Sequence, residues 1–408
     1  MSVPLDRLYN FLGDCCDQDV IIYRFFPFGS KNLLECLPLQ DRAWYDAMIL
    51  PHVWFFDQEC IDFSNWTAVS RYFMHDRQMI KTDFPVHWLR NRSLVPYHLC
   101  ANAIVVHSEL NSQEVDTLAA HGYQTVHWFS HAAIARDWYR YAEHDPALLQ
   151  KGQSAQHRFL IYNRAWTGTR EYRLWFANAL AQTGLISECN TSLAFIDGQR
   201  HYQQHVFKNP VWRPILRLED YFDQNHTPSD ASADYCSSDY GHQIIEVVLE
   251  TIFDDSKISL TEKSLRPIAT ATPFIVAGPP GSLQYLRHYG FQTFSPWINE
   301  AYDKEPDSHA RLTMIVQELQ RLANLSHADF GRVLDHCQQI AYKNREIFFS
   351  NSFHAKIIDE YRSGINHVVE LVSSQVDPRP WNMVKSTHTV QQQQQIDQYL
   401  QLQKSFMR

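Results

Sequence analysis

Short apolar runs alternate with helical patterns along the first part of the chain. The runs are rich in β-branched and aromatic residues and are bounded by polar or turn residues, which is typical of buried strands. They cover residues 19–28, 46–56 and 102–109. Residues 110–122 then carry a helical pattern that ends at a glycine, and a further short strand is predicted at 123–130. Strands that alternate with helices at this pace predict a parallel sheet covered by helices.

The same alternation returns after a polar stretch at residues 144–158, where we expect a domain boundary. Beyond it, strands are predicted at 158–163, 244–251, 273–278 and 291–294, and helices at 170–184, 262–271 and 282–290. Residues 308–372 are mostly helical in pattern. The sequence therefore predicts an α/β protein with two Rossmann-like domains, residues 1–150 and 151–355, and a C-terminal helical tail at 356–408.

Composition narrows the class of protein. The chain has 408 residues, of which 45% are hydrophobic and 20% charged, an ordinary globular balance. No apolar run approaches the ~20 residues that a membrane-spanning helix needs, and the N-terminus lacks the basic and apolar regions of a signal peptide. The 8 cysteines include no CxxC pair, which argues against a disulfide framework or a zinc ribbon. We expect a soluble, cytoplasmic protein with no membrane partner.

The net charge of −9 argues against a general nucleic-acid binder, because phosphate neutralisation supplies most non-specific affinity. One segment departs from this balance. Residues 71–98 hold five Lys or Arg and three His against two acids, interleaved with aromatic residues. This segment is either a solvated loop and helix surface or a groove for a phosphodiester acceptor, in which the contacts come from Arg77, Lys81, Arg90 and Arg92.

Residues 259–282 carry the most informative chemistry. Thr261 or Ser264 can cap a helix whose first turns hold Glu262, Lys263 and Arg266. A helix N-terminus beside two cations is suited to bind a diphosphate, and the neighbouring carboxylate is suited to ribose hydroxyls. The alternative is a capped surface helix with an ordinary Glu–Lys pair.

The order of motifs around this helix resembles the donor-binding half of fucosyltransferase-type and exostosin-like glycosyltransferases. The matching positions are Glu250, Thr261, Glu262, Lys263, Pro273 and Gly278. The whole chain also looks like glycosyltransferase-like proteins of tailed phages, with FDQE in the first half and WFSHAAIARDWYRY before the predicted boundary.

This resemblance implies a GT-B fold, with two Rossmann-like domains facing across a cleft and the nucleotide-sugar held by the second. In fucosyltransferases the matching Glu contacts the nucleotide and the Lys meets the diphosphate, which implies that Glu262 and Lys263 bind the donor. Arg266 and Pro267 depart from the pattern of the family, so the geometry of the helix is open. The resemblance also extends donor contacts to Glu250, and the turn at Gly281 and Ser282 is expected to close around the sugar or phosphate.

A second basic cluster lies at residues 162–173. Asn163 and Arg164 stand where the predicted strand 158–163 ends, and this is the edge at which α/β sheets bind ligands. Arg170 lies about one helical turn before Arg173. We interpret Asn163, Arg164 and Arg170 as further donor contacts, and the alternative is a solvent-exposed loop and helix.

Candidates for a general base lie in the first domain. Asp57 and Glu59 follow the predicted strand 46–56, and His52 is placed to orient the acceptor or share its proton. Glu109 follows the next strand and is the other candidate. Each carboxylate could instead cap a helix or bind a loop amide. His127 and His131 have a spacing that can ligate a metal on a helix, but core or site-lining roles fit them better.

Together these features predict a metal-independent glycosyltransferase that needs no cofactor besides its nucleotide-sugar co-substrate. The acceptor is either a hydroxymethylated base of viral double-stranded DNA, which places the enzyme in the host cytoplasm, or a saccharide. The alternative is a non-catalytic nucleotide-sugar or glycan-binding protein on the same fold.

Overall fold

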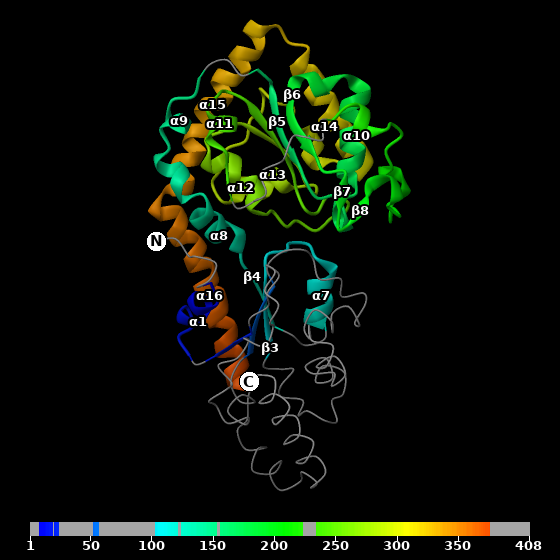
Figure 1. Ribbon diagram of the computed structural model, residues 1–408. Coiled ribbons are helices and arrows are strands. Elements are labelled where there is room, and N and C mark those ends of the chain that lie inside the picture. Colours follow the sequence, from blue (N-terminus) through cyan, green and yellow to red (C-terminus); the bar gives the residue numbers. More distant parts are fainter. Residues whose placement is uncertain are drawn as a thin grey trace, which may run out of the picture.

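The computed structural model describes residues 8–18, 20–23, 52–56, 103–120, 124–152, 156–222 and 234–375. Within these residues, two parallel sheets of four strands each are packed with helices, and a small antiparallel pair of strands lies at the edge of the second unit (Figure 1). The protein is therefore α/β with long helices towards its C-terminus, in agreement with the alternating pattern of the sequence.

The first sheet has the order β1-β2-β3-β4, and all of its pairings are parallel. Its strands are β1 (Ile21–Tyr23), β2 (His52–Phe56), β3 (Ala103–His107) and β4 (Gln124–His127). All four fall inside segments that the sequence predicts as strands. Val53, Ile104 and Val126 are buried, because both faces of a parallel sheet are usually covered.

The second sheet has the order β10-β9-β5-β6 and is also entirely parallel. Its strands are β5 (Phe159–Asn163), β6 (Cys189–Leu193), β9 (Ile245–Leu249) and β10 (Phe274–Ala277). The chain runs from β5 to β6 on one side and later to β9 on the other side. The strand order thus reverses between β5 and β9, which makes this pair the topological switch point of the sheet.

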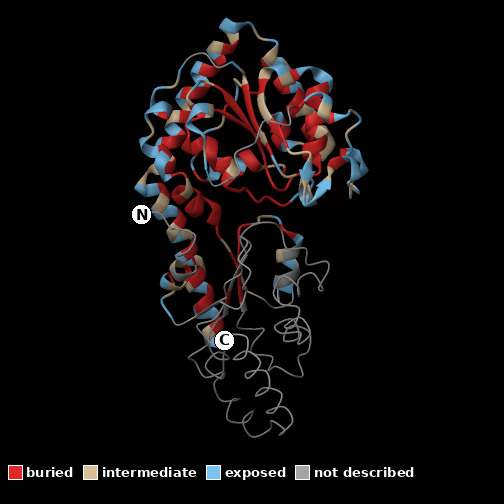
Figure 2. Ribbon diagram, viewed as in Figure 1, coloured by how far each residue is buried: buried red, intermediate tan, exposed pale blue. Residues whose placement is uncertain are grey.

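Helices cover both faces of the second sheet. In Figure 1, α10 and α14 lie on one side of it and α12 and α15 on the other, and Figure 2 shows the buried strands between helices with exposed outer faces. None of the described helices is both long and apolar enough to cross a membrane. The helices are α1 (Leu8–Asp14), α7 (Gln113–Ala120), α8 (Ser130–Trp138), α9 (Pro146–Leu149), α10 (Tyr172–Thr183), α11 (Ser237–Tyr240), α12 (Glu262–Ala269), α13 (Ser282–His288), α14 (Ser308–Ala323), α15 (His327–Phe349) and α16 (Asn351–Gln375).

One prediction for the second sheet is wrong, and one of its strands is missed. Residues 291–294 form no strand, because Asn344 of α15 takes both hydrogen-bonding groups of Gln292: its Oδ1 accepts from the backbone N–H at 2.8 Å and its Nδ2 donates to the C=O at 2.8 Å. The strand β6, rich in polar residues, is absent from the prediction. Its alternation of partly buried and buried residues lacks the continuous apolar run of its neighbours.

The longest of the described helices, α16, returns the chain from the second sheet to the first. α16 lies beside β4 and α1 in Figure 1, and it accepts a hydrogen bond from Trp128 Nε1 at the carbonyl of Ile357 (3.0 Å). Tyr361 Oη donates to the carbonyl of Leu12 (3.1 Å). A single cluster of buried apolar side chains runs through both sheets and α16. The C-terminal helix therefore holds the two parts of the molecule together.

An ion pair is buried in the core under α12. The guanidinium of Arg266 donates to Glu246 Oε1 from Nη2 (2.6 Å) and Nε (3.2 Å), while Tyr240 Oη donates to Glu246 Oε2 (2.8 Å). Glu246 is fully buried and Arg266 is 6% exposed. Arg266 also lies over the ring of Tyr162 at 4.4 Å. The sequence interpretation that counts Arg266 among the cations of an anion site is wrong, because β9 supplies its counter-ion inside the core.

Removing the charge of Glu246 should destabilise the fold strongly. Glu246→Gln leaves the guanidinium of Arg266 buried without a counter-ion, which costs about 3–5 kcal/mol of unfolding free energy. The double variant Glu246→Gln/Arg266→Met should recover much of this loss. Urea unfolding of the three proteins measures both effects, and a loss below about 1 kcal/mol in the single variant would contradict the assignment.

Candidate functional site

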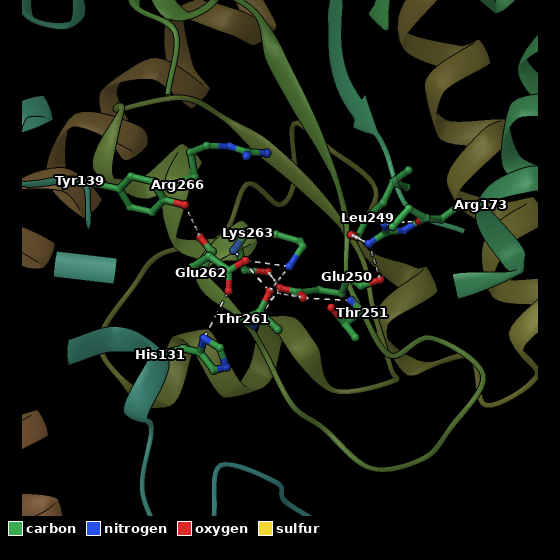
Figure 3. A network of polar contacts seen from close by, with 12 residues as sticks. His131, Tyr139, Arg173, Leu249, Glu250, Thr251, Thr261, Glu262, Lys263 and Arg266 are labelled. Carbon is green, nitrogen blue, oxygen red and sulfur yellow. Dashed lines mark hydrogen bonds and ion pairs between the residues drawn. The ribbon is translucent and has the colours of Figure 1, made fainter. Parts of the chain in front are cut away.

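The carboxylate of Glu250 organises the backbone at the switch point. Glu250 follows β9 directly and is 0% exposed. Its Oε1 accepts from the Thr261 backbone N–H (3.1 Å) and from Ser264 Oγ (2.6 Å). Its Oε2 accepts from Thr261 Oγ1 (2.7 Å) and from the Thr251 N–H (3.2 Å). Four donors on one carboxylate tie the end of β9 to the start of α12 (Figure 3).

The N-terminus of α12 is capped as the sequence predicts. Thr261 has extended backbone angles, and its Oγ1 accepts from the Lys263 N–H at 3.3 Å. Pro267 lies inside the helix rather than at its start. The proline nitrogen has no hydrogen to donate to the Lys263 carbonyl, and α12 ends two residues later at Ala269.

Lys263 and Glu262 form a pair at this helix start, and His131 of α8 lies next to Glu262 (Figure 3). Lys263 Nζ lies 2.7 Å from Glu262 Oε1, and His131 Nδ1 lies 3.3 Å from Glu262 Oε2. Burial by itself raises the pKa of the Glu262 carboxyl, but Lys263 and His131 outweigh it and hold the pKa well below its ordinary value. The Glu262 side chain is 3% exposed and that of Lys263 22%. The ammonium is thus the more accessible member of the pair.

Arg170 reaches the same region from β5. It ends the 3-10 turn η5 (Gly168–Arg170), and Thr169 Oγ1 of that turn donates to the Thr251 carbonyl at 2.7 Å. This turn and the start of α12 are therefore both bonded to residues 250–251. Burial and the neighbouring Arg173 lower the pKa of Arg170 to about 10, which leaves it positive at neutral pH. Arg164 lies in the preceding loop and is exposed.

Arg173 and Asn163 are structural members of this edge. Arg173 is 3% exposed, and its Nη2 donates to the carbonyls of Leu249 (2.5 Å) and Glu250 (3.1 Å). Asn163 is 2% exposed and donates from Nδ2 to the Arg173 carbonyl at 3.0 Å. Its Oδ1 is buried and has no hydrogen-bond partner among the residues that the structure describes. These contacts fix the ends of β5 and β9 relative to each other.

The hydrogen-bonding groups of the turn at Gly281 and Ser282 are already bonded to other groups of the protein. The Gly281 N–H donates to the Asp303 carbonyl (2.7 Å), and the Ser282 Oγ donates to the Pro279 carbonyl (2.6 Å). The next amide, of Leu283, donates to Asp303 Oδ1 at 2.9 Å. Gly281 has φ +86°, which favours glycine. The amides that would hold a phosphate thus attach α13 to the Asp303 segment.

The carboxyl ends of the first sheet meet this region. Leu110 and Ile258 exchange backbone hydrogen bonds of 2.8 and 2.9 Å just before α12. Glu109 accepts from Ser112 Oγ (2.6 Å) and lies 3.9 Å from Lys257 Nζ. Glu109, a predicted base, is therefore brought to the second unit and is engaged there by a hydroxyl and an ammonium.

Two histidines end β3 and β4 beside α13. The rings of His107 and His127 meet edge to face at 5.8 Å. His127 Nδ1 lies 3.2 Å from Glu360 Oε1, and its Nε2 lies 3.3 Å from Tyr285 Oη. Burial and the ring of His127 lower the pKa of His107 to about 4. His127 and His131 contact different partners, and no group of three or more metal-ligating side chains occurs among the residues that the structure describes.

Most of the other predicted site residues lie outside the part of the chain that the structure describes. Asp57 and Glu59, the remaining base candidates, lie outside the described residues, as do the predicted acceptor contacts Arg77, Lys81, Arg90 and Arg92. The backbone of His52 opens β2 and pairs with Ala103. Conversely, sequence reasoning missed the partnership of His131 with Glu262, because no local pattern signals a contact between two distant segments.

No family model matches the chain, and no curated protein or solved structure gives a significant match to it.

Glu250→Gln should loosen the start of α12. The amide nitrogen would face donors in place of an acceptor, so at least one of them is left unsatisfied, at a cost of about 1–3 kcal/mol. The measurement is the free energy of unfolding in urea, with Glu346→Gln on the exposed face of α15 as the matched control. An equal free energy of unfolding for the two variants would show that the four hydrogen bonds of Glu250 do not stabilise the start of α12.

Burial of His107 should make stability sensitive to acid. Its pKa in the folded protein, about 4, lies below its ordinary value of 6.5. Between these two pH values the imidazole is therefore protonated in the unfolded chain and neutral in the folded protein. Stability from this residue is complete above pH 6.5 and is lost as the pH falls towards about 4. The total is about 3 kcal/mol.

His107→Gln should therefore reduce the fall in unfolding free energy between neutral pH and about pH 4 by about 3 kcal/mol. The control is His327→Gln, at the exposed start of α15. Urea unfolding at a series of pH values measures both variants. Parallel stability curves for wild type and His107→Gln would contradict the prediction.

Proposed function

We propose that this protein is a glycosyltransferase of the GT-B arrangement that takes a nucleotide-sugar as donor. The observation that carries the proposal is the set of cations at the switch point of the second sheet. In open α/β sheets, ligands bind outside the carboxyl ends of the strands where the strand order reverses. Here Arg164 and Arg170 follow β5, and Lys263 opens the helix after β9.

These cations fit the diphosphate of a nucleotide-sugar. Transfer breaks the bond between the anomeric carbon and a diphosphate oxygen, and negative charge grows on that oxygen as the bond breaks. Lys263 and Arg170 stabilise this charge as preformed donors. Glu262 acts as a positioning residue, since its side chain is buried and holds the Lys263 ammonium until the diphosphate replaces it as partner.

The contact between the two sheets supports the two-domain arrangement. Because Leu110 follows β3 and Ile258 precedes α12, their hydrogen bonds join the carboxyl ends of both sheets. A base from the first sheet would then stand near the sugar. Glu109 is the described candidate, and Asp57 and Glu59 remain candidates outside the described residues. The base removes the proton of the acceptor hydroxyl, on either a saccharide or a hydroxymethylated base of duplex DNA.

A non-catalytic nucleotide-sugar or glycan-binding protein is the second candidate. The observation that favours it is the engagement of Glu109, whose carboxylate already accepts from Ser112 and lies near Lys257. The two functions are separated by incubating the protein with UDP-, GDP- and dTDP-sugars and measuring released diphosphate. The acceptors are hydroxymethylated duplex DNA, plain duplex DNA and simple sugars. Binding of a donor without turnover with any acceptor favours the binding protein.

Lys263→Met should weaken the binding of a nucleoside diphosphate about 10- to 100-fold, because one charge-assisted contact to phosphate is lost. Lys263→Arg should retain most of the affinity. Titration calorimetry with UDP, GDP and dTDP measures the change for the nucleotide that binds.

The matched control is Lys356→Met, since this exposed lysine on α16 contacts only a backbone carbonyl, that of His288, and the ring of Tyr289 among the described residues. Thermal melting of each variant checks that the fold is retained. Wild-type affinity in a folded Lys263→Met protein would show that the diphosphate site is assigned to the wrong helix.

A further inference from the structure

A long irregular segment after the small strand β8 (Arg200–His201) is held tightly against α10. Two side chains at or in this helix anchor it. The Glu171 carboxylate accepts from the backbone N–H groups of Lys208 (2.8 Å) and Asn209 (3.1 Å). Asn178 Oδ1 accepts from the N–H groups of Ile215 (2.9 Å) and Leu216 (2.8 Å). Because the two anchors lie about two helical turns apart, the segment runs along one face of α10.

This attachment divides the side chains of the segment into two sets. Trp212 and Leu218 point inwards and are fully buried. Val206, Val211 and Ile215 are 79%, 41% and 83% exposed. Val211 and Ile215 lie within the stretch whose amides are bonded to α10, and Val206 precedes it by two residues. We call Val206, Val211 and Ile215, with the cations between them, the aliphatic patch.

The concentration of exposed aliphatic side chains is unusual for this molecule. Eight large hydrophobic residues of the described chain are well exposed, and five of them fall between residues 196 and 221. Single exposed apolar residues are normal, but a group of them on an ordered backbone marks an interaction surface. The other three lie at Tyr141, Leu149 and Leu371, away from this segment.

The charge of the segment is opposite to that of the whole protein. Residues 200–217 contain Arg200, Lys208, Arg213 and Arg217 but no Asp or Glu, in a chain with a net charge of −9. All four cations are exposed. Acids flank both ends of this range: Asp197 is the cross-strand neighbour of Arg200, and Glu219 and Asp220 each lie 3.8 Å from Arg217. The patch therefore combines aliphatic side chains with two cations, Lys208 and Arg213, that have no acidic residue within five positions in sequence.

We propose that the aliphatic patch docks the protein on an anionic lipid bilayer. The lack of a long apolar run in the sequence leads us to expect no membrane partner, but peripheral contact needs only apolar side chains flanked by Lys or Arg. Aliphatic side chains enter the acyl boundary while the cations meet lipid phosphates. Nucleic acid fits less well, because single strands are held by stacking on aromatic rings and duplexes mainly by polar contacts to phosphate.

Vesicle sedimentation tests the proposal with the full-length protein. The vesicles are phosphatidylcholine alone and phosphatidylcholine with about one third phosphatidylglycerol. We expect binding to the anionic vesicles that weakens with added salt. Val206→Ser/Ile215→Ser should lower the partition coefficient at least about tenfold. Arg213→Gln should lower it about fivefold.

Matched controls lie on other surfaces of the same molecule. Leu149→Ser removes an exposed aliphatic side chain (48% exposed) from α9, and Arg332→Gln removes an exposed cation from α15. Both should leave vesicle binding unchanged. All variants change exposed side chains, and thermal melting checks that each is folded.

Three outcomes would overturn the proposal. The first is equal or absent sedimentation with neutral and anionic vesicles. The second is binding to duplex DNA that depends on Arg213 but not on the aliphatic pair, which would make the patch a nucleic-acid surface. The third is loss of vesicle binding in the control variants to the same extent as in the patch variants. None of these outcomes depends on whether the protein turns over a nucleotide-sugar.

Discussion

The hydrogen bonds of one buried carboxylate, Glu250, determine the geometry of the second unit at its carboxyl edge. They join the end of β9 to the start of α12 and so close the loop that connects them. Within that loop, Ile258 pairs with Leu110 beyond β3. The same carboxylate therefore fixes the helix that carries Lys263 and the contact between the two sheets. A buried charge is tolerated here because four donors satisfy it.

The two cations of α12 serve different purposes, and burial separates them. Arg266 is enclosed with Glu246 and Tyr240, so its charge is compensated inside the core. Lys263 lies about one turn earlier in the helix. Its side chain is 22% exposed and pairs with Glu262. A ligand can compete for Lys263 but has no access to Arg266. The proposed diphosphate site accordingly combines Lys263 with the arginines after β5 rather than with its neighbour in sequence.

Local patterns in the sequence predict most of the strands and the cap of α12. The runs that contain β1, β2, β3, β4, β5, β9 and β10 are rich in β-branched and aromatic residues, and Thr261 has the side chain that a helix start requires. The sequence misleads where a distant side chain decides the outcome. The side chain of Asn344 bonds both backbone groups of Gln292, so residues 291–294 form no strand. The carboxylate of Glu246 pairs with Arg266 inside the core. Asp303 likewise takes the amides after Gly281 that a glycine-containing turn offers to a phosphate. Such pairings depend on tertiary contacts, which no window of sequence contains.

A crystal structure with a bound nucleoside diphosphate tests the central claim most directly. The account predicts diphosphate density outside the carboxyl ends of β5 and β9, within contact distance of Lys263 Nζ and the Arg170 guanidinium, with Lys263 turned away from Glu262. Density at another edge of the sheet, with the Lys263–Glu262 pair intact, would contradict it.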